Sequence, residues 1–298
     1  MRSSRSPRSS LTRCSGSLQR PATASDSIQG QLRELGFEQE DVPVEPNHRV
    51  YHHPGTILPR IVVSDQAQAD PAAPLATAIQ VEDISHFLMT HHLAVPIEGS
   101  LVSPYRRSVA WQQDGRRVLV VERRGHAGFV PAEMPPDYAQ QYLRAFERWA
   151  TRSRLFDDDL AGMEAALALA RSLVSDMGTD TAAWIAFEAE RAHWQRRNRA
   201  GQVQKARQDQ LGMGWANHDH HTFRSSRRAF PLLVEILETF GFHSRERFYA
   251  GAEAGWGAQV MEQPACRFAI FADVDLAPDE VDGDRSEERR VGKECRSR

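Results

Sequence analysis

The stretch from Trp215 to Arg224, Trp-Ala-Asn-His-Asp-His-His-Thr-Phe-Arg, is the part of the sequence from which the fold is best inferred. Three of the chain's twelve histidines fall within four residues here. Side chains alternate between the two faces of a strand. If this stretch is a strand, one face carries His218, His220, Thr222 and Arg224. His221 and Phe223 then lie on the other face.

The spacing of these histidines supports two interpretations. In a strand, the Cα atoms of His218 and His220 are about 7 Å apart, so both imidazoles can approach one cation. The alternative is a set of structural histidines that form hydrogen bonds. A single strand cannot complete a catalytic site, because a catalytic metal usually has about three protein ligands and one open position. The other ligands must come from elsewhere.

The residues after Arg224 predict one helix and three more strands. Apolar residues recur at helical spacing from Phe230 to Phe240, Ser225 or Ser226 can cap the helix, and Gly241 can end it. Strands are expected at 242–249, 257–261 and 268–274, between glycine and proline punctuation. The expected order is therefore β-α-β-β-β.

This order and these residues resemble the vicinal oxygen chelate superfamily of glyoxalase- and dioxygenase-like proteins, whose modules curve a small sheet around a divalent metal. The run Asp219-His-His-Thr-Phe-Arg224 is similar to the Asp-His-x-x-[Leu/Phe]-Arg motif of the 2-oxoadipate dioxygenase/decarboxylase family. The likeness covers roughly residues 210 to 276. Those enzymes use iron(II) and oxygen to oxidise and decarboxylate a 2-oxo acid, and two His and one Glu hold the metal.

The resemblance implies that His220 is a metal ligand and that Arg224 holds a substrate carboxylate. Imidazole suits iron(II), and a guanidinium matches the geometry of a carboxylate. His218 is expected to be a second ligand or a proton shuttle. An exposed salt bridge is the alternative for Arg224. Asp273 and Asp275 can supply a carboxylate or simply form a solvated strand end.

The family's second His and its Glu belong to a later module. The tail from Arg285 to Arg298, Arg-Ser-Glu-Glu-Arg-Arg-Val-Gly-Lys-Glu-Cys-Arg-Ser-Arg, resembles the in-frame translation of a sequencing adapter. We therefore expect a natural chain that continues past about Asp284. On this interpretation the sequence is a C-terminally truncated fragment that holds half of an active site and turns over little substrate.

The remaining sequence predicts an α+β protein in several parts. Residues 1–74 are expected to form a disordered or loosely structured leader, and 75–135 a small α+β unit with one helix and a β-hairpin at Asp114-Gly115. Residues 136–211 are expected to be helical, and 212–284 to form the β-α-β-β-β module. The helices are placed at 138–154, 157–177 and 181–210.

Composition excludes several classes of function. The chain has 298 residues and a formal net charge of −3, but residues 26–284 contain 26 basic and 37 acidic residues, a net charge of −11. This charge repels a polyanion, so no nucleic-acid partner is expected. No apolar run approaches the ~18 residues of a membrane span. Three widely separated cysteines fit neither a disulfide framework nor a zinc site, which favours a reducing, cytoplasmic location.

These observations lead to one main hypothesis and two alternatives. The main hypothesis is an enzyme, a metal-dependent, iron(II) oxygenase that acts on a small 2-oxo or hydroxy acid, with that carboxylic acid and oxygen as its partners. A lyase or isomerase on the same scaffold is the nearest alternative, because a fold does not fix a reaction. The third hypothesis is a non-catalytic binding or structural module that uses its histidines for hydrogen bonding.

Overall fold

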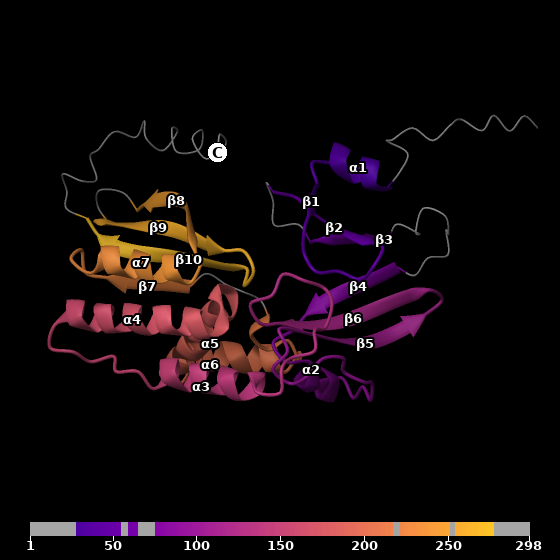
Figure 1. Ribbon diagram of the computed structural model, residues 1–298, viewed down its shortest axis with the longest axis horizontal. Helices are drawn as coiled ribbons and strands as arrows, with labels where there is room; N and C mark the ends of the chain where they lie inside the picture. Colours follow the sequence, from indigo (N-terminus) through magenta and orange to yellow (C-terminus); the bar gives the residue numbers. More distant parts are fainter. Residues whose placement is uncertain (1–27, 55–58, 65–74, 217–220, 251–253, 277–298) are drawn as a thin grey trace, which may run out of the picture. The chain divides into compact units, whose positions relative to one another are not determined.

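The structure, a computed structural model, describes residues 28–54, 59–64, 75–216, 221–250 and 254–276 (Figure 1). The fold is α+β, and the described residues form helices and three separate sheets. The chain divides into two compact units, one of residues 1–41 and 47–71, the other of residues 42–46 and 72–298. Within the described ranges, no helix has both the length and the apolar character that crossing a membrane requires.

The described part of the first unit is a short helix with a small antiparallel sheet. Its elements are α1 (Ile28–Glu34), β1 (Glu38–Glu40), β2 (His48–His52) and β3 (Ile61–Ser64), and the strand order is β1-β2-β3. Leu32, Phe37, Tyr51 and Val63 form its core. The sequence suggested only loose structure before residue 75, because these strands are short and are separated by proline-rich segments.

The second unit begins with a three-stranded sheet in the order β4-β6-β5, made of β4 (Leu75–Gln80), β5 (Tyr105–Gln113) and β6 (Arg116–Arg123). The hairpin predicted at Asp114-Gly115 is confirmed, since both residues have positive φ angles of 48° and 73°, as a tight hairpin turn requires. The predicted helix is also confirmed as α2 (Ile84–Thr90), and the Asp83 side chain caps it by accepting a bond from the His86 amide.

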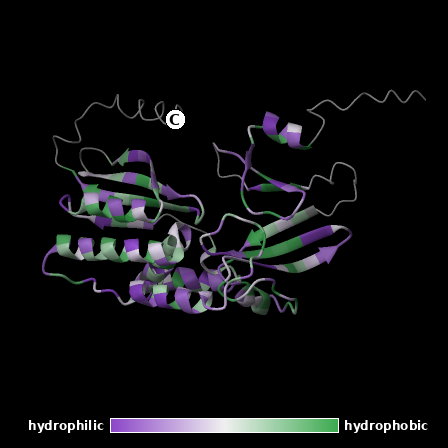
Figure 2. Cartoon of the chain, viewed as in Figure 1, coloured by the Kyte–Doolittle hydropathy of each residue, from purple (hydrophilic) through white to green (hydrophobic). Residues whose placement is uncertain are grey.

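Four helices follow: α3 (Tyr138–Ala150), α4 (Asp159–Met177), α5 (Thr179–Gln195) and α6 (Arg199–Asp209). The prediction of one helix over 181–210 is wrong, because the chain breaks at 196–198. Asn198 then starts α6, its side chain accepting a hydrogen bond of 3.1 Å from the Gly201 amide. Figure 2 shows α6 as largely hydrophilic, in keeping with its lack of buried residues.

The predicted strand from Trp215 to Arg224 is only partly present. Residues 214–216 form a 3-10 turn, and the described strand, β7, runs over His221–Ser225. The turn is fixed because the Trp215 amide donates to the Glu82 carboxylate at 2.8 Å, and the indole donates to Gln195 at 2.7 Å. A backbone amide used in this way is not available to a sheet.

The β-α-β-β-β order from β7 onward is present. The helix is α7 (Phe230–Thr239), and the further strands are β8 (His243–Tyr249), β9 (Trp256–Gln263) and β10 (Phe268–Asp275). The strand order is β7-β10-β9-β8, with β7 parallel to β10 and the other pairs antiparallel. Gly241, at φ 78°, follows the helix as predicted.

The helices cover one face of this sheet. Phe187 of α5 packs against this face of the sheet. Its ring centroid lies 5.6 Å from that of Phe223, 5.0 Å from that of Phe242 and 4.9 Å from that of Phe268. Leu237 and other apolar residues of α7 belong to the same core cluster, as do residues of α3 and α4. The helical segment and the sheet therefore share one hydrophobic core.

A buried ion cluster holds α3 against α5. One carboxylate oxygen of Glu190, Oε1, accepts hydrogen bonds from Arg152 at 2.5 Å, Arg154 at 2.9 Å and the Trp149 indole at 3.0 Å. Burial by itself raises the pKa of Glu190, but the hydrogen bonds and charges of the two arginines outweigh it and lower this pKa. Glu190 is therefore a carboxylate in the folded protein.

Replacing Phe187 with alanine should reduce the free energy of unfolding by about 3–5 kcal/mol, because the change leaves a cavity between α5 and the sheet. Urea unfolding followed by circular dichroism measures the loss. The matched control is Leu155→Ala, since Leu155 is 90% exposed, and this change should alter stability by less than about 0.5 kcal/mol. Similar losses in the two variants would contradict the packing described.

Replacing Glu190 with glutamine should destabilise the chain by roughly 3 kcal/mol at pH 7, because two guanidinium groups lose their buried counter-charge. A folded pKa below the unfolded value means that the cluster stabilises the protein above the ordinary carboxyl pKa, and that this stability disappears as pH falls through the folded pKa. The difference between wild type and Glu190→Gln should therefore shrink at acidic pH, as urea unfolding at several pH values would measure.

The exposed pair of Glu235 with Arg171 provides the control for this test. Glu235→Gln should change stability by less than about 1 kcal/mol at pH 7. A difference between wild type and Glu190→Gln that stays constant from pH 7 to pH 3 would argue against the ionised cluster.

Candidate functional site

The face of the β7-β10-β9-β8 sheet opposite the helices, which we call the open face, carries Arg224, Asp273 and Asp275 from the residues that the sequence singled out. The alternation predicted for the strand holds over its described residues: Phe223 packs on Phe187, while Thr222 and Arg224 are exposed. The strand register places Thr222 opposite Phe271 and Arg224 opposite Asp273. The core cluster formed with the helices lies on the other face.

Arg224 forms an ion pair with Asp275 at the end of β10. Both side chains are 62% exposed, so water screens the pair and its contribution to stability is small. This is the salt bridge that the sequence left as the alternative for Arg224. An exposed pair of this kind leaves the guanidinium able to exchange Asp275 for another carboxylate.

Asp273 lies on the same face and in a drier environment. Its Oδ1 atom is buried and accepts no hydrogen bond from any described residue. Burial raises the pKa of Asp273, and the nearby charge of Arg224 offsets only part of this effect. A buried carboxylate oxygen without a donor is costly, and a bound cation or a proton can satisfy it.

Three aromatic side chains form an apolar patch on the open face. The ring centroid of Phe248 lies 5.6 Å from that of Trp256 and 6.4 Å from that of Phe271. Trp256 is paired in register with Asp275, so the patch adjoins the charged residues. Sequence reasoning missed this patch, although the period-two spacing of Phe271, Asp273 and Asp275 along β10 was a usable signal that they share one face.

The structure places the other sequence candidates as follows. His218 and His220 lie outside the described residues. His221 faces the helices, with its ring 5.3 Å from Phe187 and 5.5 Å from Phe268. Among the residues that the structure describes, no group of three or more His, Cys, Asp or Glu is arranged to hold a metal ion.

Cys266, the one cysteine among the described residues, is buried and hydrogen-bonded. Cys266 is buried in the β9–β10 turn, where its amide donates to Gln263 and its thiol to the backbone carbonyl of Asp180. Burial and the charge of Asp180 raise the pKa of the thiol. Because the thiolate is the reactive form, the raised pKa and the burial of Cys266 disfavour a nucleophilic role.

Comparisons with known proteins return no relative: no protein-family model, curated protein or solved structure matches this chain significantly.

Replacing Asp273 with asparagine should raise the free energy of unfolding of the metal-free protein by roughly 1 kcal/mol at pH 7, since it removes a carboxylate that is poorly solvated there. Because the folded pKa of Asp273 lies above the unfolded value, its ionised form destabilises the folded protein at pH 7. Below the unfolded pKa the side chain is protonated in both states, so the gain from Asp273→Asn should disappear there. Thermal unfolding at pH 7 and pH 3 measures both effects. A loss of stability at pH 7 would contradict this description.

Proposed function

We propose that the β7-α7-β8-β9-β10 module provides a metal-dependent, iron(II) oxygenase site for a small 2-oxo or hydroxy acid. The observation that carries the proposal is the position of Arg224, which is exposed on the face of a β-α-β-β-β sheet opposite the helices and, among the described residues, forms an exposed ion pair with Asp275. The likeness of Asp219-His-His-Thr-Phe-Arg224 to the 2-oxoadipate dioxygenase/decarboxylase motif gives this arginine its proposed partner, a substrate carboxylate.

The donor chemistry of the open face fits a divalent cation. The buried Oδ1 of Asp273, which lacks a hydrogen-bond donor among the described residues, is an oxygen that a cation would satisfy. We propose His220 and His218 as the nitrogen ligands, with His218 as an alternative proton shuttle, and Asp273 as the carboxylate. Two imidazoles with one carboxylate are the usual ligand set of iron(II) oxygenases. Bound iron(II) would supply a centre that activates oxygen and polarises the substrate's oxygens.

The residues of the open face would bind and orient the acid. The guanidinium of Arg224 would hold its carboxylate through two parallel N–H donors, which fixes both position and orientation. The aromatic patch of Phe248, Trp256 and Phe271 would cover the hydrocarbon part of the acid and exclude water beside it. Asp275 would be released to solvent when the acid binds.

The test measures metal and acid binding separately. Anaerobic iron(II) and 2-oxoadipate are titrated into the full chain by calorimetry. Arg224→Gln should weaken 2-oxoadipate binding at least tenfold, the loss of one charge-assisted pair, and should leave iron affinity within about twofold. His220→Gln should weaken iron binding at least tenfold. Arg228→Gln is the matched control, because Arg228 is an exposed arginine paired with Asp158, away from the open face.

Each outcome supports or contradicts the proposal. Absence of binding by both iron(II) and 2-oxoadipate to the unmodified chain would contradict the proposal and leave a non-catalytic module as the alternative. Equal effects of Arg224→Gln and Arg228→Gln would exclude Arg224 as the carboxylate site. Conversion of the acid without oxygen uptake, measured with an oxygen electrode, would replace the oxygenase by a lyase or isomerase.

A further inference from the structure

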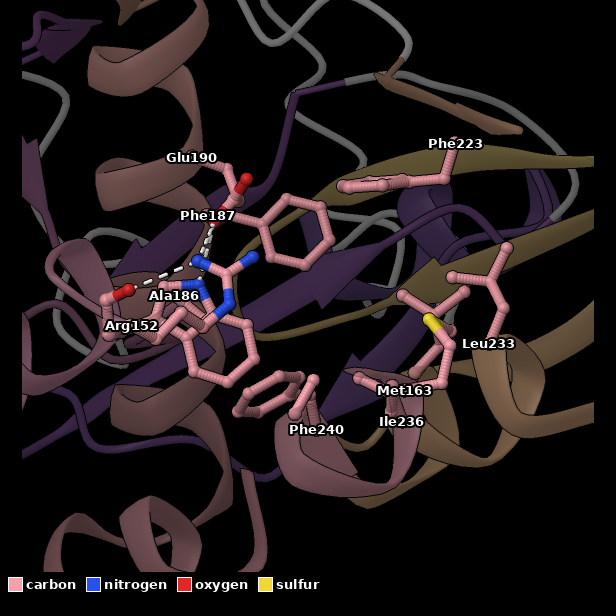
Figure 3. Close-up of a pocket in the computed structure, with 12 residues that line it drawn as sticks. Arg152, Met163, Ala186, Phe187, Glu190, Phe223, Leu233, Ile236 and Phe240 are labelled. Carbon is pink, nitrogen blue, oxygen red and sulfur yellow. Dashed lines mark hydrogen bonds and ion pairs between the residues drawn. The ribbon is translucent and has the colours of Figure 1, made fainter. Parts of the chain in front are cut away.

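A cavity lies on the helix-covered side of the sheet, opposite the open face. It has a volume of about 130 Å³ and lies among α3, α4, α5, α7 and β7 (Figure 3). Ten of its twelve lining residues are apolar, and the two charged ones are Arg152 and Glu190. Its walls include the rings of Phe187, Phe223 and Phe240. The cavity is therefore an apolar chamber with an ion pair on one wall.

The size of the cavity limits what can occupy it. An apolar cavity of about 150 Å³ in another protein stays dry and binds benzene. A space of 130 Å³ accordingly suits one six-membered ring or a short branched chain, and it is too small for a nucleotide or a long acyl chain. Aromatic rings on the walls favour a flat apolar body, which they can contact edge to face.

The ion cluster beside the cavity carries an excess of positive charge. Arg152 and Arg154 both contact one oxygen of Glu190, so two positive charges meet one negative charge. Arg152 uses its Nη1 for Glu190 and for the Trp149 carbonyl, while its Nη2 makes no hydrogen bond to any described residue. The Nη1 of Arg154, by contrast, is committed to the carbonyls of Ala150 and Arg152. The Nε of Arg154 is also buried without a hydrogen-bond partner among the described residues, but Arg154 does not line the cavity. Arg152 is therefore the arginine of the cluster whose unused donor is available to a ligand in the cavity.

We infer that this cavity binds a small carboxylic acid with an apolar body of about one ring, such as benzoate. The ring would lie among Phe187, Phe223 and Phe240, and the carboxylate would accept hydrogen bonds from Arg152. A second negative charge would bring the cluster with Arg154 and Glu190 to neutrality. The cavity is separate from the open face, because Phe223 and Arg224 point to opposite sides of β7.

Benzoate and toluene are the probes, titrated into the full chain and followed by saturation-transfer NMR. Benzoate should bind more tightly than toluene. Arg152→Met should weaken benzoate at least tenfold and leave toluene bound, which also shows that the variant is folded. Ala166→Leu, which fills the cavity from α4, should abolish binding of both probes. Arg148→Met is the matched control: Arg148 lies in the last turn of α3, four residues before Arg152, and pairs with Asp176 at the surface.

The opposite results would overturn the inference. Failure of both probes to bind the unmodified chain would exclude the cavity as a ligand site. Benzoate affinity that is unchanged in Ala166→Leu would place the site elsewhere, and affinity unchanged in Arg152→Met would exclude the proposed carboxylate contact. Loss of benzoate in Arg224→Gln, with retention in Arg152→Met, would assign it to the open face instead. The inference and the proposed oxygenase site can therefore fail independently.

Discussion

The packing of Phe187 against the strands is the contact on which the rest of this unit depends. One ring from α5 contacts Phe223 of β7, Phe242 immediately before β8, and Phe268 of β10. Small residues around it, such as Ala183 and Ala186, are fully or almost fully buried and let the helix approach the sheet closely. Because one face of the sheet is used in this way, its charged and aromatic residues are presented on the other.

This division of the sheet accounts for both candidate sites. Arg224 is available to a ligand because its neighbour in sequence, Phe223, takes the helix-facing position. The same Phe223 forms part of the wall of the cavity beneath the sheet. Strand β7 therefore contributes alternate residues to two chemically different environments, an open face with exposed charges and a partly open apolar cavity beside a buried ion cluster.

The sequence predicted features that depend on local pattern. The period-two alternation placed Phe223 and Arg224 on opposite faces, and Asp114-Gly115 fixed a hairpin, because each signal involves only neighbouring residues. Interactions between distant residues were not predictable. The Glu82 carboxylate that captures the Trp215 amide is 133 residues away in the chain, and it turns a predicted strand start into a 3-10 turn. The cluster of Arg152 with Glu190 likewise joins two helices that the sequence could not align.

The central claim, that the helices bury one face of the sheet and leave the other open to ligands, is tested most directly by thiol labelling. Thr222→Cys and Ala272→Cys lie on adjacent strands but on opposite faces, and each can be made in a chain with Cys14→Ser and Cys295→Ser. The account predicts that Ellman's reagent labels Cys at 222 rapidly and labels Cys at 272 only when the protein opens. Equal labelling rates, or protection at 222 with rapid reaction at 272, would contradict it.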